Sequence, residues 1–332
     1  MDVPLWVWIA TVGGLLVLLA VDLVIVDHKP HKVTIGEAAR WVIFYIACAV
    51  LFGIGIWLFV PDVGGEMAKQ FFAGYITEYS LSVDNLFVFV VIMNAFAVPL
   101  IHQHRVLLFG IVMALFMRGI FIGVGSAAIH EFSWIFYLFG AFLIYTAYHL
   151  ASAGGDDDSD EFKENIMLRT VRRVLPVTDK YHEHKSFIRI DGKRWVTPMF
   201  VVMFAIGSTD LLFALDSIPA IFGLTQEAFL VFTANAFALM GLRQLYFLIG
   251  GLLNRLVYLS IGLSVILGFI GVKLIFEALR ENTLSFLNGG KSIPVPEISI
   301  ELSLTVIVSV LFLTTVASLI KVKLDPSAVK KL

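Results

Sequence analysis

Residues 201–222 read VVMFAIGSTDLLFALDSIPAIF and contain the most costly side chains of the chain. The stretch is apolar enough to span a bilayer, yet it holds Asp210 and Asp216. A carboxylate in a membrane span costs a few kcal/mol even on translocon-insertion scales, so such residues indicate a functional site. We therefore interpret this stretch as a membrane helix that contributes to a polar site.

A second apolar stretch, ITEYSLSVDNLF at residues 76–87, has the same pattern. In both stretches an acid is followed after five residues by an aspartate and then by Asn or Ser. These two acidic blocks are the features around which we interpret the rest of the chain. The aligned pairs are Glu78 with Asp210, Asp84 with Asp216, and Asn85 with Ser217.

The composition predicts an all-α polytopic membrane protein. Of the 332 residues, 59% are hydrophobic and 15% charged, whereas soluble domains average about half apolar and a quarter charged. Apolar runs of about 20 residues recur along the chain, as in helical membrane proteins. The net charge of −2 gives no basic field for nucleic acid, and the single cysteine, Cys48, excludes a disulfide within the chain.

Hydropathy predicts nine transmembrane helices and five regions. The regions are two N-terminal helices (1–69), a first repeat half (70–151), a loop with a short helix and a hairpin (152–197), a second half (198–280), and an outer loop, last helix and basic tail (281–332). The predicted spans are 5–26, 38–60, 70–96, 106–128, 132–151, 198–221, 227–249, 256–279 and 299–320.

The distribution of basic residues predicts the orientation. The loop 152–197 alone holds nine Lys and Arg residues, whereas the next loop, 223–226, is uncharged. Basic loops face the cytoplasm, and here the odd-numbered loops and the tail are the basic ones. We expect a multi-pass protein of the cell inner (plasma) membrane, with the N-terminus outside and the C-terminus cytoplasmic. Within the long loop, the pattern of residues 162–175 predicts a basic helix. Asp191-Gly192 lies between two stretches in which apolar and polar residues alternate, which predicts a hairpin.

The two acidic blocks predict an inverted repeat. Each acidic span is followed by a span that contains an arginine, Arg118 in the first half and Arg243 in the second. Spans three to five therefore correspond to spans six to eight. An odd number of crossings separates the two triplets, so they run in opposite directions. Inverted repeats of this kind are typical of secondary transporters, whose ion site lies near the midplane between the halves.

The spacing of the acids limits how they can act together. Residues six apart on a straight helix are separated by about 9 Å and roughly 120° around the axis. Asp210 and Asp216 therefore cannot bind one ion from an unbroken helix. Either the helix unwinds between them, or each acid meets an acid of the other half. Pro219 favours unwinding, because it leaves the Leu215 carbonyl without its helical donor.

The chemistry of these residues favours a hard divalent cation. Carboxylate, amide, hydroxyl and carbonyl oxygens suit Mn²⁺, Mg²⁺ or Ca²⁺ better than Zn²⁺ or Cu. Protons or the two arginines should balance the carboxylates when the site is empty, which makes exchange of metal for protons a hypothesis. The alternative is a purely structural network of buried charges. The candidate ligands are Glu78, Asp84, Asn85, Asp210, Asp216 and Ser217, supported by Ser82, Thr209, the Leu215 carbonyl, Arg118 and Arg243.

The chain resembles the TerC family, named for tellurium resistance. The resemblance rests on EYSLSVDNLFVF at 78–89, TDLLFALDSIPAIF at 209–222 and FTANAFALMGLR at 232–243. It implies a LysE-type transporter and, from family members implicated in manganese export, Mn²⁺ as the transported ion. Members of the family often carry an acid at the position of Gly207, and this chain does not.

Two functions follow as expectations. The first is export of a divalent cation, foremost Mn²⁺, across the lipid bilayer. The second is a non-transporting membrane factor that delivers metal to exported proteins or assists membrane-protein assembly, with a secretion-machinery or exported-protein partner. We expect no enzyme, because the sequence has no nucleophile–base constellation and no phosphate-binding glycine loop.

Overall fold

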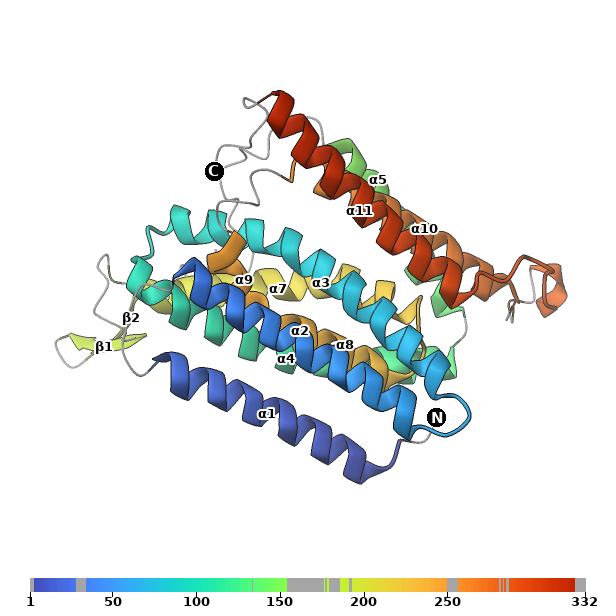
Figure 1. Cartoon of the computed structure of the whole chain (residues 1–332), viewed down its shortest axis with the longest axis horizontal. Helices are drawn as coiled ribbons and strands as arrows, with labels where there is room; N and C mark the ends of the chain where they lie inside the picture. Colours follow the sequence, from blue (N-terminus) through green and yellow to red (C-terminus); the bar gives the residue numbers. More distant parts are fainter. Residues whose placement is uncertain are drawn as a thin grey trace.

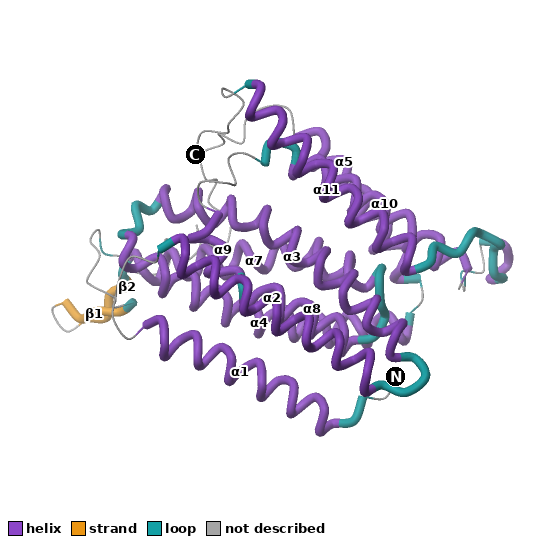
Figure 2. Tube along the Cα trace, viewed as in Figure 1, coloured by secondary structure: helices purple, strands orange, loops and turns teal. Residues whose placement is uncertain are grey.

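The computed structural model is a bundle of long helices with one small hairpin (Figures 1 and 2). It describes residues 3–27, 34–132, 134–153, 176, 178, 186–190, 193–249, 256–280, 282, 284 and 287–325, without some side chains in these ranges, that of Asp84 among them. The helices are α1 (Leu5–Asp27), α2 (Ile35–Phe59), α3 (Gly64–Ala95), α4 (Leu100–Glu131), α5 (Ile135–Ala153), α7 (Pro198–Phe222), α8 (Ala228–Met240), α9 (Leu242–Ile249), α10 (Leu259–Arg280), the short η2 (Asn288–Gly290) and α11 (Ile300–Leu324).

The helix lengths confirm the predicted fold class of a multi-pass all-α membrane protein. Among the described residues, eight helical segments are long and apolar enough to cross a membrane: α2, α3, α4, α5, α7, α8 together with α9, α10 and α11. The corresponding apolar part of α1 is the shorter Leu5–Val21. The predicted seventh span, 227–249, is divided at Gly241, where α8 ends and α9 begins.

Side chains at the helix ends explain where several helices begin. Thr34 Oγ1 accepts the N–H of Glu37 (3.3 Å) before α2, and Ser299 Oγ accepts that of Leu302 (3.2 Å) before α11. Pro198 occupies the first turn of α7, where a missing N–H costs nothing. Pro219 also lies in α7, but the helix continues to Phe222. The structure therefore lacks the unwinding that was one of the two predicted arrangements.

The predicted hairpin corresponds to two short strands, β1 (Phe187–Ile190) and β2 (Lys193–Val196), which pair antiparallel with Phe187 opposite Val196. The ring of Phe187 packs on Phe200 of α7, with centroids 5.0 Å apart. The predicted turn residues Asp191 and Gly192 and the predicted helix at 162–175 lie outside the described residues.

Helices α3 and α7 cross antiparallel in the middle of the bundle. Thr225, just after α7, donates to Gln70 near the beginning of α3 (2.7 Å), so the end of one helix meets the start of the other. The packing around them is reciprocal, because α4 lies against α7, α8 lies against α3, and α5 pairs with α10. A reciprocal arrangement is what an inverted repeat produces. The equivalence of the two halves stays a prediction.

The apolar side chains form two separate cores. The first core joins α1, α2, α8 and α9 with parts of α3, α4 and α7. The second joins α5, α10 and α11 with other parts of α3, α4 and α7. Figure 1 shows α5, α10 and α11 side by side at one side of the bundle, with α1 at the opposite side and α3 and α7 between them. Helices α3, α4 and α7 therefore link the two cores.

A close backbone crossing joins α5 to α10, and we predict that it does not accept a larger side chain. A Cβ at Gly271 would lie 3.0 Å from the Gly140 carbonyl oxygen and 2.9 Å from Ile144 Cγ1. The substitution Gly271→Leu should separate the helices and cost about 1–3 kcal/mol or more, measured as a lower melting temperature in detergent. The matched control is Gly55→Leu on α2, where a Cβ would meet nothing within 4 Å. Equal melting temperatures for both variants would contradict this packing.

Candidate metal centre

The centre of the bundle contains a buried arginine. Arg118 lies midway along α4 and is 1% exposed. Ala114, one turn earlier, belongs to the first apolar core, and Ile122, one turn later, belongs to the second. The guanidinium thus lies where the two cores meet. A charge buried among apolar side chains must be paired, since the desolvation penalty is several kcal/mol per ion.

Two carboxylates from different predicted halves pair with Arg118. Asp210 of α7 accepts two parallel hydrogen bonds, from Nε to Oδ2 and from Nη2 to Oδ1, each 3.2 Å long. Glu78 of α3 accepts a hydrogen bond from Nη1 at Oε1. Both acids are buried, at 2% and 0% exposure. A fork-shaped pairing of this kind fixes the orientation of the guanidinium as well as its charge.

Two neutral oxygens accept further hydrogen bonds from the guanidinium. Nη1 of Arg118 also donates to Asn235 Oδ1 on α8 (2.6 Å) and to Ser217 Oγ on α7 (3.2 Å). Ser82 Oγ donates to Glu78 Oε1 (3.3 Å). We call these six residues the Arg118 cluster. Its members are Glu78, Ser82, Arg118, Asp210, Ser217 and Asn235, and they come from α3, α4, α7 and α8.

Helical spacing explains which side chains enter the Arg118 cluster. Ser82 is four residues after Glu78, and Ser217 is seven residues after Asp210, so each pair lies on one helix face. Asp216 is one residue away from Ser217 and therefore points to another face. There its Oδ1 accepts a hydrogen bond from Thr146 Oγ1 of α5 (3.1 Å). The two aspartates of α7 thus face different neighbours.

The Arg118 cluster is negative overall and incompletely satisfied. It contains one guanidinium and two carboxylates among its described side chains. Two of its buried atoms, Glu78 Oε2 and Asn235 Nδ2, have no hydrogen-bond partner in the described part of the structure, nor does the nearby Thr77 Oγ1. Buried polar atoms are rarely left without partners. A cation, proton or water molecule at Glu78 Oε2 would therefore stabilise the cluster, whereas Asn235 Nδ2 needs a hydrogen-bond acceptor.

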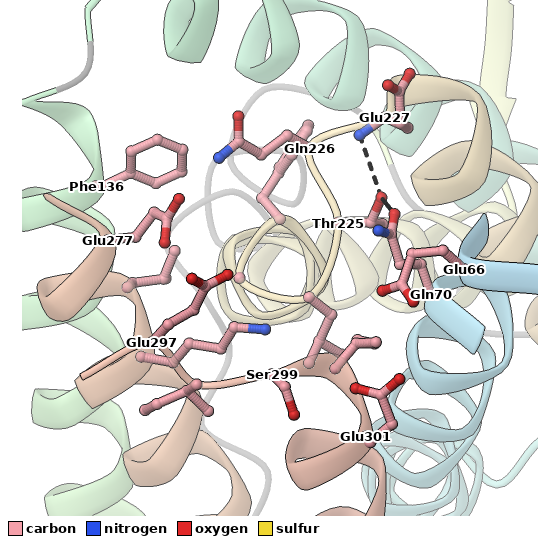
Figure 3. A pocket seen from close by; sticks show the side chains of 17 residues that line it. Glu66, Gln70, Phe136, Thr225, Gln226, Glu227, Glu277, Glu297, Ser299 and Glu301 are labelled. Atoms are coloured by element: carbon pink, nitrogen blue, oxygen red, sulfur yellow. Dashed lines mark hydrogen bonds between the residues drawn. The ribbon is translucent and has the colours of Figure 1, made fainter. Parts of the chain in front are cut away.

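A second polar region lies at one end of the bundle. A cavity of about 400 Å³ opens where α3 and α11 begin and α7 and α10 end. Figure 3 shows acids around it, with Glu66 and Glu301 on one side and Glu277 and Glu297 on the other. Ion pairs with Lys69 and Arg280 neutralise some of them. Lys273 is the one basic residue among the described lining side chains, so the cavity as a whole is acidic.

Comparison with known proteins identifies the family. The model of the integral membrane protein TerC family matches residues 63–325. The chain belongs to the TerC family. Its relatives include an uncharacterized membrane protein of Mycobacterium tuberculosis (49% identical, covering 94% of this chain and 78% of the relative) and one of Myxococcus xanthus (38%, covering 97% and 94%). The Escherichia coli protein named "Putative membrane-bound redox modulator Alx" is 37% identical, covering 78% of this chain and 82% of that protein. No solved structure matches the chain significantly.

The structure brings together only some of the site residues predicted for this TerC protein. Glu78, Asp210, Ser217, Ser82 and Arg118 belong to the Arg118 cluster. The remaining predicted residues are not among the described hydrogen-bond partners of Arg118, or are only partly described. Asn85 and Thr209 are buried on α3 and α7, the Leu215 side chain is 43% exposed, Arg243 is buried at the start of α9, Asp216 contacts Thr146, and the Asp84 side chain lies outside the description.

Two aspects of the site were not predicted. The first is the hydrogen bond between Asn235 of α8 and Arg118 of α4. The second is the seven-residue spacing of Asp210 and Ser217, a usable signal that the six-residue spacing of the acids obscured. Among the described His, Cys, Asp and Glu side chains, no group of three or more is placed to hold a metal ion. The guanidinium of Arg118 lies between the two acids.

Removing the guanidinium should strongly destabilise this TerC protein. Arg118→Ala leaves two buried carboxylates without their counter-charge, which costs about 3–5 kcal/mol. Lys69→Ala removes an ion pair whose partners are about half exposed, and such pairs contribute roughly 0–1 kcal/mol. We expect a large loss of melting temperature for the first variant and almost none for the second. Similar losses in both would show that Arg118 is not the stabilising charge of the bundle.

Proposed function

We propose that this TerC protein exports a divalent metal cation, foremost Mn²⁺, through the Arg118 cluster. The observation that carries the proposal is a pair of buried carboxylates, Glu78 and Asp210, contributed by two antiparallel membrane helices at the centre of the bundle. Secondary transporters bind their ions at such a place, between oppositely oriented halves near the midplane.

The ligand chemistry supports a hard cation. The groups available around Arg118 are carboxylate, amide and hydroxyl oxygens, which Mn²⁺ and Mg²⁺ prefer. Ser82 lies next to Glu78 and could supply a neutral oxygen to the ion. The negative charge of the described cluster attracts a cation, and protons released from the acids would couple export to proton entry.

The acidic cavity supports a direction of transport. It is formed mainly by the beginnings of α3 and α11, the ends of α7 and α10, and residues 223–227 and 297–299. These helix ends and loops face outward in the orientation expected from the basic residues, with the C-terminus on the cytoplasmic side of the inner membrane. Its acids would concentrate cations on their way out. Asp216, bonded to Thr146 on another face of α7, and Asp84 would be further carboxylates along the path.

Neutralising the acids tests the proposal. Glu78→Gln and Asp210→Asn should each lower Mn²⁺ efflux from proteoliposomes by at least about tenfold, a loss that even outer-shell partners of a metal site commonly cause. Glu78→Gln should stay folded, because the amide oxygen still accepts from Arg118 and the cluster loses its excess negative charge. Efflux rate and melting temperature are measured on the same samples.

The matched control is Asp62→Asn. Asp62 lies in the loop between α2 and α3 at a φ of 62°, a conformation that asparagine tolerates well. This variant removes the same charge far from the Arg118 cluster, and its efflux should equal that of the wild type. If the cluster variants transport Mn²⁺ as fast as Asp62→Asn does, the export proposal is wrong.

One observation favours the second function, a non-transporting factor that delivers metal to exported proteins or assists membrane-protein assembly. Arg118 engages both oxygens of Asp210 and one oxygen of Glu78, as a purely structural network would. Such a factor would depend on a protein partner at the loop 152–197. Deleting this loop would then abolish partner association, whereas an exporter without the loop would still move metal.

The orientation is tested by cysteine labelling in a Cys48→Ala background. Gln226 is exposed at the acidic cavity, and Arg189 is exposed on β1. A membrane-impermeant maleimide added to intact spheroplasts should label Gln226→Cys, while Arg189→Cys should react only after the cells are opened. The reverse pattern would place the acidic cavity on the cytoplasmic side and contradict an outward exit.

A further inference from the structure

The guanidinium of Arg118 occupies the atoms that a metal ion would need. Both carboxylate oxygens of Asp210 and one oxygen of Glu78 accept hydrogen bonds from it. Glu78 Oε2 is the one oxygen of these two carboxylates that has no partner in the described part of the structure. A cation can therefore approach the acids at Oε2, whereas at Asp210 it meets the positive charge of the guanidinium at short range unless the arginine moves away.

We propose that Arg118 is a tethered counter-ion that closes the empty site and competes with the transported metal for the same carboxylates. This inference rests on the proposed export function. Without metal, the arginine pairs with Glu78 and Asp210 and offsets part of their negative charge. When a dication binds the acids, it replaces the arginine as their partner and repels it at short range in a medium of low dielectric.

The cluster also offers the displaced guanidinium neutral partners. Nη1 already donates to Asn235 Oδ1 (2.6 Å) and to Ser217 Oγ (3.2 Å). These two oxygens can keep their hydrogen bonds with the arginine after the carboxylates are released. They lie on α8 and α7, so the guanidinium stays at the junction of the two cores and can return when the metal leaves.

This competition gives Arg118 a role in the transport cycle. When the protein returns without metal, two unpaired carboxylates in the low-dielectric middle of the bundle would carry a high desolvation cost. Pairing with Arg118 offsets this cost and allows the empty protein to reset. The arginine therefore weakens metal binding and at the same time speeds the return step, two effects that a merely structural ion pair would not produce.

The test compares wild type, Arg118→Gln and Arg118→Lys in purified form, with Arg40→Gln as the control, since Arg40 is exposed on α2. Mn²⁺ binding is measured by titration and by the rise in melting temperature on adding Mn²⁺. Radiolabelled Mn²⁺ flux is measured in proteoliposomes in two modes, net efflux into metal-free buffer and exchange with Mn²⁺ on both sides.

We expect Arg118→Gln to bind Mn²⁺ at least about tenfold more tightly. The reason is that the arginine no longer holds most of the protein in a state that cannot bind the metal. Its melting temperature should be low without Mn²⁺ and should rise more on adding Mn²⁺ than that of the wild type. Net efflux should fall about tenfold while exchange stays within about twofold, since only exchange avoids the return of the empty site. Arg118→Lys should give values between those of the wild type and Arg118→Gln, because a lysine keeps the charge but cannot form the forked hydrogen bonds to both acids.

Unchanged or weaker Mn²⁺ binding by Arg118→Gln, or equal loss of both flux modes, would overturn the inference while wild-type export still stands. If Arg118→Gln does not fold, the same measurements on Arg118→Lys test the inference. An affinity of Arg118→Lys for Mn²⁺ equal to that of the wild type, with an equal ratio of efflux to exchange, would overturn it. If the wild type and Glu78→Gln move Mn²⁺ alike, the export proposal itself fails, and the inference fails with it.

Discussion

The pairing of Arg118 with Glu78 and Asp210 is the interaction on which the arrangement of this bundle depends. Each of these charges would be strongly unfavourable alone in an apolar interior, so the three helices that carry them must meet. The result is a bundle in which α3, α4 and α7 link two apolar cores at one polar point. The reciprocal packing of α4 on α7 and of α8 on α3 surrounds this point.

The same interaction connects stability to the proposed transport. A pair of acids that only stabilised the fold would gain little over well-packed apolar residues. Acids held by a movable arginine can instead exchange one cation for another without leaving a bare charge in the membrane. Helix α7 stays continuous and presents Asp210 and Ser217 on one face and Asp216 on another. Because α7 is not unwound, an ion path would pass beside this helix and would not use a break in it.

The sequence predicted the membrane class, the approximate spans and the charged residues that pair, because hydropathy and isolated intramembrane charges are strong local signals. The family was predicted from the resemblance of three motifs. The sequence did not determine which acid meets which partner, since that depends on how α3 and α7 cross. The unwinding inferred from Pro219 did not follow, because a helix can lose one donor and remain helical when its neighbours pack well. The pairing of Asn235 with Arg118 was not predicted either, since a single amide gives no spacing pattern.

Diffraction from crystals soaked in Mn²⁺, recorded at the manganese absorption edge, tests the central claim most directly. The account predicts an anomalous peak between α3 and α7 within bonding distance of Glu78 and Asp210, with the Arg118 guanidinium moved off both carboxylates and still close to Asn235. A protein that transports Mn²⁺ but shows its peak elsewhere, with Arg118 still bridging the two acids, would contradict it.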